Sequence, residues 1–441
     1  MNMTIETKIM NAKNASMKLA RVSEKTKNAC LKLMGNALDA NREKILIANK
    51  KDIANMEISH SKALIERLKV DDKKIDGMIA GINDVIKLKD PIGDTIDAIE
   101  LDNGLELYQV SCPIGLIGVI FESRPDVVPQ IMALCLKSGN AVVFKGGKEA
   151  KNSNQMIFDI LTNSIKEIEE VSNDAFLILE TREEVKNILN FDKYIDLLIP
   201  RGSNEFVKYI QDNTKIPVLG HADGICHVFV DEFADLTKAL DICFDSKVQY
   251  PAVCNAMETL LIHKNIANTF LEDIVEKYNS VNVKMYFDDK SYKLIKSEKI
   301  PKHHATEENW VTEYNDMIIS IKIVDSIDAA IDHINKYGSH HTDSIVTENK
   351  ENKKLFIDLI DSSSVIINAS TRFADGFRYG KGAEIGVSTN KIHARGPVGM
   401  EGLLIYKYIL IGNGDKVSDY ADGKKIFTHK KLDKRFPLVY S

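Results

Sequence analysis

The stretch that decides the fold is Leu116-Ile-Gly-Val-Ile-Phe121, an unbroken apolar run that predicts a fully buried strand. A helical pattern over 127–136 follows, and Ser138-Gly139-Asn140 supplies a stop signal. The chain then enters a second short apolar strand, Ala141-Val-Val-Phe144. A strand, a helix and a strand in this order predict a βαβ unit, in which both strands run parallel in one sheet.

The same alternation of apolar runs and helical patterns extends along most of the chain. It predicts helices over 154–169, 183–189 and 203–211 and strands over 175–179, 195–199 and 216–219. It restarts near 225, with strands over 257–263, 318–324 and 344–347. The N-terminal part, up to Pro91, reads as helices. These patterns predict an α/β fold of two units with mainly parallel sheets, joined near 235–250.

Two predicted strands do not fit this alternation. Residues 105–110 alternate apolar and polar side chains, and Pro113 and Gly115 separate them from the buried run at 116–121. Residues 402–411 are rich in Leu, Ile and Tyr, but no helix follows them. A strand of this kind pairs with another chain or with a distant hairpin, so we expect an oligomer.

Composition and charge exclude several classes of protein. The 441 residues include 58 Lys and Arg against 64 Asp and Glu, and the net charge of −6 gives no electrostatic reason to hold nucleic acid. No apolar run approaches the ~18–20 residues of a membrane-spanning helix, and the polar N-terminus lacks an apolar signal core. The six cysteines are scattered, without a Cys-x-x-Cys pair. We therefore expect a cytoplasmic protein that binds neither membranes nor nucleic acid.

Three loops at the ends of predicted strands have compositions that suit an anionic ligand. In Lys145-Gly146-Gly147-Lys148, two glycines let the backbone approach a phosphate and the lysines add positive charge. Two further loops also follow predicted strands and also combine glycine with charged or polar residues. They are Pro200-Arg201-Gly202-Ser203 and Gly220-His-Ala-Asp-Gly224. Neither the P-loop pattern nor the glycine fingerprint of dinucleotide-binding folds is present. An ordinary solvated turn remains the alternative for each loop.

Cys254 is the cysteine best placed for chemistry. It lies in Tyr250-Pro-Ala-Val-Cys-Asn-Ala-Met257, just before an apolar strand. A nucleophilic thiol must be partly exposed, and its pKa, ordinarily about 8.5, must be lowered by positive or dipolar surroundings. Cys112 and Cys135 lie in or next to apolar runs and read as buried hydrophobes, which leaves Cys226 as the rival. A structural role stays open for each of these thiols.

The segment 368–397 is a long polar stretch, dense in Arg, His, Gly and hydroxyl residues. Arg372, Arg378 and Arg395 could hold an anionic substrate, because a guanidinium binds a carboxylate or phosphate through two hydrogen bonds. A surface loop of ion pairs is the alternative. No metal site is expected: the adjacent pairs at 303–304 and 340–341 lack the spacing that puts two imidazoles on one helix face, and they read as exposed loop histidines.

Six blocks of this sequence closely resemble the gamma-glutamyl phosphate reductase family of the aldehyde dehydrogenase superfamily. They lie in family order at 106–125, 137–150, 198–203, 218–227, 249–256 and 368–397. The resemblance implies an aldehyde dehydrogenase-like α/β fold. Its parts would be a Rossmann-type NADP-binding domain over 1–105 and 122–243, a catalytic α/β domain over 244–400, and a small β oligomerisation element over 106–121 and 401–414. The tail 415–441 receives no role.

The resemblance also implies an activity, the second step of proline biosynthesis from glutamate. NADPH would reduce L-glutamyl 5-phosphate to L-glutamate 5-semialdehyde, with release of phosphate, through a cysteine thioester. A separate glutamate 5-kinase would be a possible partner, and the enzyme would be a homo-oligomer. The alternatives are an acylating aldehyde dehydrogenase that uses coenzyme A and a non-catalytic paralogue that scaffolds the kinase.

Carried over residue by residue, the resemblance gives each candidate a role. Cys254 would be the nucleophile, with Asn255 and Arg124 stabilising the oxyanion. Lys145 and Glu313 would hold the riboses of NADP. The other cofactor-binding residues would be Gly146, Gly147, Arg201, Gly202, Ser203 and Gly220. The substrate-binding residues would be Arg372, Arg378, His393 and Arg395.

One departure from the hydrolytic aldehyde dehydrogenases is informative. Their Glu-Leu-Gly-Gly block supplies a general base that activates water, whereas this chain has Val218-Leu-Gly-His221. Without that carboxylate, attack of water on the thioester is disfavoured. Phosphate rather than water is therefore the expected acyl partner.

Overall fold

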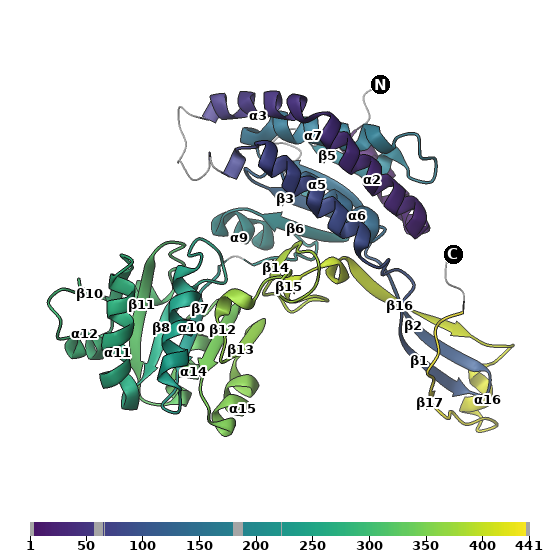
Figure 1. The fold of residues 1–441 in the computed structure, drawn as a ribbon. Helices are drawn as coiled ribbons and strands as arrows, with labels where there is room; N and C mark the ends of the chain where they lie inside the picture. Colours follow the sequence, from purple (N-terminus) through teal and green to yellow (C-terminus); the bar gives the residue numbers. More distant parts are fainter. Residues whose placement is uncertain (1–3, 57–64, 66, 180–187, 222, 438–441) are drawn as a thin grey trace. The chain divides into compact units, whose positions relative to one another are not determined.

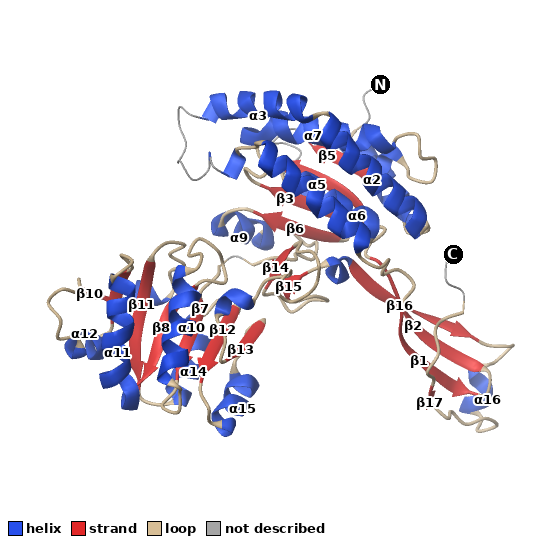
Figure 2. Cartoon of the chain, in the orientation of Figure 1, coloured by secondary structure: helices blue, strands red, loops and turns tan. Residues whose placement is uncertain are grey.

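The computed structural model describes residues 4–56, 65, 67–179, 188–221 and 223–437, and the chain forms two compact units (Figure 1). Unit 1 is Met1–Leu219 with Val398–Ser441, and unit 2 is Gly220–Pro397. Each unit contains its own parallel sheet with helices, which confirms the predicted fold class (Figure 2). Most of the predicted helix over 183–189 lies outside the described residues.

The parallel sheet of unit 1 is built around β3 (Leu116–Phe121), all of whose residues are buried. The strand order is β5-β4-β3-β6. The other strands are β4 (Ala141–Gly146), β5 (Phe176–Leu179) and β6 (Leu197–Arg201). Because β3 and β4 are adjacent and parallel, the predicted βαβ unit is confirmed. The predicted strand over 216–219 forms only one bridge, between Leu198 and Val218.

Helices from the N-terminal part of the chain cover this sheet (Figure 1). The helices of unit 1 are α1 (Ile5–Leu19), α2 (Glu24–Ala40), α3 (Arg42–Met56), α5 (Asp72–Lys87), α6 (Val127–Lys137), α7 (Lys151–Ile165) and α9 (Asn204–Asp212). Ser23 and Asp71 cap α2 and α5, each accepting a backbone hydrogen bond from the first turn. Ile75, Met78 and Ile82 form the buried face of α5, at helical spacing.

A small antiparallel sheet in unit 1 contains the strand that no helix follows. The strand order is β16-β2-β1-β17. Its strands are β1 (Thr95–Asp102), β2 (Leu105–Pro113), β16 (Leu404–Ile411) and β17 (Lys430–Lys431). β16 pairs with β2 along its whole length, so a distant hairpin is its partner within the chain. The tail adds β17 and a short helix, α16 (Val417–Ala421).

Unit 2 is built on a seven-stranded parallel sheet of order β10-β9-β11-β8-β7-β12-β13. Its strands are β7 (Cys226–Val230), β8 (Met257–His263), β9 (Lys284–Phe287), β10 (His303–His304), β11 (Ile318–Val324), β12 (Thr342–Val346) and β13 (Ser364–Ile367). Apolar clusters cover both faces. In β7, Val228 and Val230 belong to one cluster and Phe229 to the other, because side chains alternate across a strand.

The helices of unit 2 alternate with these strands. They are α10 (Leu236–Val248), α11 (Lys264–Asn279), α12 (Asp289–Leu294), α13 (Glu307–Trp310), α14 (Ile327–Tyr337) and α15 (Lys350–Leu359). The short strands β14 (Gly386–Ser388) and β15 (Gly396–Val398) form a separate two-stranded sheet. Among the helices that the structure describes, none is both long and apolar enough to cross a membrane.

The structure corrects two predicted boundaries. Residues 106–121 are not one element, because β2 belongs to the antiparallel sheet and β3 to the parallel sheet. Between them Gly115 adopts a φ of 130°, and a Cβ there would lie 2.3 Å from Asp196 Oδ2. The first unit does not extend to residue 243, because β7 pairs with β8 and β12 in the sheet of unit 2. The boundary therefore falls between Leu219 and Gly220.

A buried ion pair joins α10 to β8 inside unit 2. Lys247 Nζ lies 2.6 Å from Glu258 Oε2, and both side chains are almost completely buried. Burial lowers the pKa of Lys247 and raises the pKa of Glu258 to about 7, while each partner's charge opposes the shift. Removing one partner of such a pair leaves an uncompensated buried charge, which is far more costly than removing an exposed pair.

We expect Lys247→Met to lower the free energy of unfolding of unit 2 by about 3–5 kcal/mol, measured by urea denaturation. The matched control is Lys354→Met, whose partner Asp358 lies on the exposed face of α15 and whose loss should cost less than about 0.5 kcal/mol. The double variant Lys247→Met/Glu258→Met should recover most of the loss. Equal urea midpoints for Lys247→Met and the wild-type protein would contradict this expectation.

Candidate active site

Cys254 lies in the loop between α10 and β8 of unit 2, and its side chain is half-buried. Gly224, near the start of this unit, lies directly against it. A Cβ on Gly224 would lie 2.3 Å from the carbonyl oxygen of Cys254 and 2.5 Å from its Cα. Only glycine permits this approach, so Gly224 provides close backbone packing beside the thiol, and the anion-binding role considered for its loop stays a prediction.

Two imidazoles flank the thiol. His221 comes from the start of unit 2 and His341 from the residue before β12, and the Cys254 Sγ and one ring nitrogen of each histidine lie within 4.8 Å of one another. The two rings meet edge to face, with centroids 4.9 Å apart. His221 Nδ1 is hydrogen-bonded to the Val387 carbonyl at 3.0 Å, and His341 Nδ1 to Thr342 Oγ1 at 2.9 Å. These contacts fix the ring orientations.

The charges of this cluster favour an ionised thiol. Burial alone would raise the pKa of Cys254, but the positive charges of His341 and His221 outweigh burial and hold that pKa well below its usual range. Burial alone would lower the pKa of His221, but the Cys254 thiolate and the Val387 carbonyl raise it to about 9. A thiolate beside an imidazolium is therefore the favoured state near neutral pH. That state supplies the activated nucleophile that thiol chemistry needs.

Among the described residues, none of the other five cysteines lies between two imidazoles, although Cys226 Sγ is 3.8 Å from His341 Nδ1. All six are free thiols. Burial raises the pKa of each of the others: Cys30, Cys112, Cys135, Cys226 and Cys243. Cys226, the rival considered from the sequence, is fully buried, and its Sγ donates to the Cys254 carbonyl at 3.1 Å. The geometry therefore favours Cys254 as the reactive thiol.

Two of the predicted ligand-binding residues of unit 2 lie near the thiol. Arg372 is buried, and its Nε donates to Gln249 Oε1 at 2.9 Å, which ties it to the segment that carries Cys254. Burial lowers the pKa of Arg372, and the negative charge of Cys254 opposes that shift. Glu313 helps to raise the pKa of His221, so its carboxylate also acts on this cluster.

Asn255 is buried beside Cys254. Its Nδ2 donates to the Ala374 carbonyl at 2.9 Å, whereas its Oδ1 finds no hydrogen-bond partner among the described residues. One of the two Nδ2 hydrogens of Asn255 thus binds the Ala374 carbonyl, in the segment that follows Arg372. The predicted role of Asn255 as an oxyanion donor rests on the other hydrogen and stays a prediction.

The remaining candidates of the polar segment have different surroundings. The Arg395 guanidinium donates to Asp361 Oδ1 at 3.2 Å, to the Asp361 carbonyl at 3.0 Å and to the Thr389 carbonyl at 3.2 Å. This arrangement matches the ion-pair loop that was the alternative for this segment. Arg378 donates to the Arg372 carbonyl at 2.9 Å, and its side chain is exposed, as is that of His393. Their substrate contacts stay predictions.

In unit 1, the predicted cofactor residues gather at one edge of the parallel sheet. Phe121, at the end of β3, is in register with Gly146 and Arg201, so the loops that follow β3, β4 and β6 leave the same edge. In such sheets, ligands bind at the carboxyl ends of the strands. Lys145, the residue before the last in β4, is buried, and its Nζ donates to the Gly146 carbonyl. Arg124 lies in the loop after β3.

The glycines at this edge let neighbouring side chains approach the backbone closely. A Cβ on Gly146 would lie 2.3 Å from Asn154 Nδ2, and one on Gly202 would lie 2.6 Å from Glu122 Oε2. The Ser203 N–H, at the start of α9, donates to Glu122 Oε2 at 2.9 Å. The Glu122 carboxylate therefore already accepts a hydrogen bond from the Ser203 backbone amide, which was expected to contact an anionic ligand. The predicted contacts of these residues with a dinucleotide stay a prediction.

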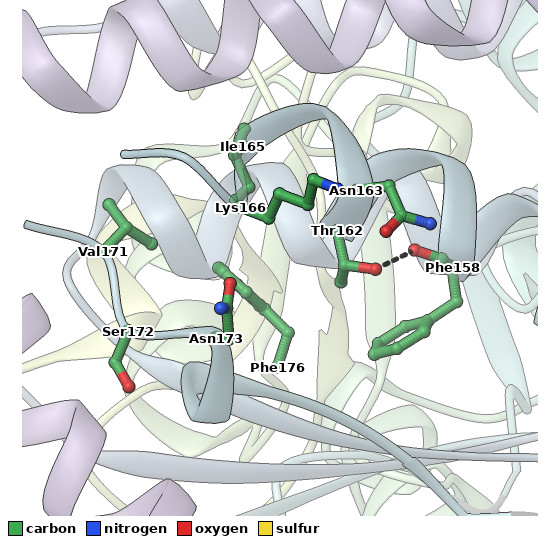
Figure 3. A pocket seen from close by; sticks show the side chains of 9 residues that line it. All are labelled: Phe158, Thr162, Asn163, Ile165, Lys166, Val171, Ser172, Asn173 and Phe176. Atoms are coloured by element: carbon green, nitrogen blue, oxygen red, sulfur yellow. Dashed lines mark hydrogen bonds between the residues drawn. The ribbon is translucent and has the colours of Figure 1, made fainter. Parts of the chain in front are cut away.

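A separate pocket of unit 1 lies away from this edge (Figure 3). It has a volume of about 280 Å³, and residues of α7 and of the turn before β5 line it, among them Phe158, Lys166 and Phe176. Thr162 Oγ1 donates to the Phe158 carbonyl at 2.9 Å within it. None of the predicted site residues, all of which the structure describes, lines this pocket. It is therefore not the predicted cofactor site.

Sequence reasoning missed both imidazoles. The expectation of exposed loop histidines is wrong for His341, which is fully buried, whereas His340 is exposed. His221 carried a usable signal, because it stands in the block where the hydrolytic enzymes have their carboxylate base. The sequence interpretation noted the missing carboxylate but did not assign the histidine. Gly220, the remaining predicted cofactor residue, is buried at the start of unit 2.

Comparison with known proteins first defines the broad class. The aldehyde dehydrogenase family model matches residues 2–309, so this chain belongs to the aldehyde dehydrogenase family. The acetylating aldehyde dehydrogenase from Geobacillus thermoglucosidasius has a TM-score of 0.63 at 14% identity, covering 93% of this chain and 97% of its own. That likeness shows the shared fold alone.

Within this class, the chain belongs to the gamma-glutamyl phosphate reductases. It is 66% identical over 440 residues to the gamma-glutamyl phosphate reductase of Methanococcoides burtonii, covering 98% of both chains. It is 52% identical to that of Acetivibrio thermocellus, covering 99% of this chain and 100% of the relative. The crystal structure of the enzyme of that name from Thermotoga maritima has a TM-score of 0.90 at 40% identity, covering 93% of this chain and 99% of its own.

Proposed function

We propose that this chain reduces L-glutamyl 5-phosphate to L-glutamate 5-semialdehyde with NADPH and releases phosphate, as the second step of proline biosynthesis from glutamate. The observation that carries the proposal is the ionised Cys254 between His221 and His341, in a chain 66% identical to a gamma-glutamyl phosphate reductase. An acyl phosphate is an activated acyl donor, so its reduction needs a soft nucleophile more than a base that activates water.

The first chemical step uses the thiolate. Cys254 Sγ attacks the acyl carbon, the bond between that carbon and the phosphate oxygen breaks, and phosphate leaves with the electron pair. The product is a thioester on Cys254. His221 and His341 keep the thiol ionised before the attack. With Val218 at the position of the carboxylate base, water is poorly activated and the thioester persists until it is reduced.

The second step needs a hydride, which bound NADPH supplies. Reduction of the thioester gives a tetrahedral oxyanion on Cys254, and the nearby imidazolium charge stabilises it. Collapse of this oxyanion breaks the C–S bond, releases the aldehyde and restores the thiolate. Asn255 and Arg124 are the additional oxyanion donors proposed from the family resemblance.

We propose NADP as the cofactor. The backbone at Gly146, Gly147 and Gly202 would contact the phosphates once the side chains that now lie against these glycines move aside, and Lys145 near the end of β4 would hold a ribose. Arg201 would add charge, Ser203 would donate its amide, and Gly220 and Glu313 would contact the nicotinamide half. These residues bind and orient the cofactor and take no part in bond breaking.

The proposal is tested by the reverse reaction. Purified protein with L-glutamate 5-semialdehyde, NADP and inorganic phosphate should produce NADPH, and omitting phosphate should abolish that production. If coenzyme A replaces phosphate with equal rates, the chain is an acylating dehydrogenase instead. If neither acyl acceptor supports NADP reduction, the chain is a scaffold without this activity.

Arg372 is expected to bind the anionic substrate. Losing a charge-assisted contact costs about 1.5–3 kcal/mol, so Arg372→Ala should raise KM for glutamyl 5-phosphate by more than about tenfold. The matched control is Arg395→Ala, because Asp361 and Thr389 already occupy that guanidinium. Its KM should change by less than about threefold. Equal KM increases in both variants, from steady-state kinetics, would contradict a specific role for Arg372.

We further propose a cytoplasmic homo-oligomer that can associate with a separate glutamate 5-kinase. β16 is an edge strand with exposed apolar side chains, including Tyr406, Tyr408 and Leu410. Size-exclusion chromatography with light scattering at micromolar concentration should give at least a dimer. Tyr408→Lys should shift the protein toward the monomer, and a wild-type monomer would contradict the proposal.

A further inference from the structure

The cluster that activates Cys254 has the composition of a zinc site. It combines one thiolate and two imidazoles, the ligand types that Zn²⁺ prefers in proteins. Their donor atoms lie within 4.8 Å of one another, and three protein ligands leave a fourth position for water. Tetrahedral zinc with bonds of about 2.0–2.3 Å needs donors about 3.4–3.6 Å apart, so the side chains must close by about 1 Å.

The second observation comes from the buried polar atoms. His341 is fully buried, and its Nε2 has no hydrogen-bond partner among the described residues. An unpaired buried ring nitrogen is costly unless a ligand satisfies it. Its other nitrogen, Nδ1, is hydrogen-bonded to Thr342, so Nε2 is the atom left to bind a metal.

The ring of His221 is held in the same way. Its Nδ1 contacts the Val387 carbonyl and must therefore donate a hydrogen to it when the ring is neutral, which leaves the Nε2 lone pair free. Hydrogen bonds from the far nitrogen to a backbone carbonyl or a side-chain oxygen are the usual outer support of metal-bound histidines. Both rings thus have the support of a metal ligand before any metal binds.

We propose that Cys254, His221 and His341 form a reversible inhibitory site for Zn²⁺. Cys254 is already ionised, so binding forms the Cys254 Sγ–Zn²⁺ bond and releases the proton of the neighbouring imidazolium, because both rings must be neutral to bind the metal. The two imidazoles complete the protein ligands, and water takes the fourth position. Because the metal occupies the Cys254 Sγ lone pair, it blocks acylation, and a chelator restores the free thiolate. The proposal depends on the ligand geometry and not on the identity of the substrate.

Co²⁺ is the probe, because thiolate-bound tetrahedral Co²⁺ gives a sulfur-to-metal charge-transfer band and intense visible bands. Titration of the reduced, metal-free full chain under anaerobic conditions should show one equivalent bound with both features, and Zn²⁺ should displace it. Cys254→Ser should abolish the charge-transfer band, and His221→Asn and His341→Asn should each weaken binding by at least about tenfold.

Two matched controls keep the result specific. Cys112→Ser removes the other half-buried thiol, and His393→Asn removes an exposed histidine; both should bind Co²⁺ like the wild-type protein. The absence of a saturable charge-transfer band in the wild-type protein, or its persistence in Cys254→Ser, would overturn the proposal. Because Cys254→Ser is nearly isosteric, its far-UV circular dichroism checks folding independently of activity.

The same titration separates this proposal from the proposed function. Zn²⁺ should also stop NADP reduction by the semialdehyde, and a chelator should restore it. If the protein binds Co²⁺ as described but shows no activity with semialdehyde and phosphate, the metal site stands and the proposed function fails. Activity that is unaffected by Zn²⁺ at saturating occupancy of the cobalt site would overturn the inhibitory role.

Discussion

Cys254→Ala is expected to lower kcat for phosphate-dependent NADP reduction by at least about 10³-fold, because no other group can form the thioester. Binding of NADPH, measured by fluorescence titration, should stay near the wild-type value, since the proposed cofactor contacts at Lys145, Gly146 and Gly202 do not involve the sulfur. The protein should also keep its far-UV circular dichroism spectrum, because the half-buried thiol contributes little packing.

The control for this result is Cys112→Ala, which removes the other half-buried thiol and should retain most activity. Retention of more than a few per cent of activity in Cys254→Ala would move the nucleophile elsewhere. Cys226 is the neighbouring candidate, but full burial raises its pKa well above the usual range. Cys226→Ala alone should therefore leave the thioester chemistry intact.

The parallel strands of unit 1 could be predicted because their signal is local. β3 and β4 are short apolar runs bounded by turn residues, and a buried parallel strand needs no more than that. Sheet membership is not local. β2 and β3 lie only two residues apart and yet enter different sheets, and β7 looks like the strands before it but pairs with β8. Both corrected boundaries depend on which strands pair with each other, and this pairing has no local sequence signal.

The residues of the site also divide into those with a local sequence signal and those without one. Cys254 stood out because it lies just before an apolar strand, with Pro251 at the entry to its loop and the Asn255 amide beside it. His341 did not, because it sits beside an exposed histidine, and the turn that separates the two side chains, with His340 at a φ of 60°, has no local sequence signal. The role of Arg395 depends on Asp361, a residue 34 positions away, whose proximity only the folded chain reveals.

His221→Asn should make the activity depend on pH in a way that the wild-type enzyme does not. In the wild-type protein, the imidazolium charges hold the pKa of Cys254 well below its usual range despite burial. Without the His221 charge, the effect of burial is less opposed and the pKa of Cys254 rises. The thiolate fraction near neutral pH therefore falls. Each unit by which the pKa of Cys254 rises lowers the thiolate fraction, and therefore the rate, by up to about tenfold at pH values below the new pKa.

We therefore expect kcat/KM at pH 7 to fall by about 10–100-fold in His221→Asn, and the deficit to shrink as the pH rises toward 9. The rate of Cys254 alkylation by iodoacetamide should show the same shifted profile, which a change in substrate binding alone would not produce. His303→Asn, at an exposed histidine with no predicted role in the site, should keep the wild-type profile. A deficit that is equal at every pH would mean that His221 positions the loop through Val387 rather than stabilising the thiolate.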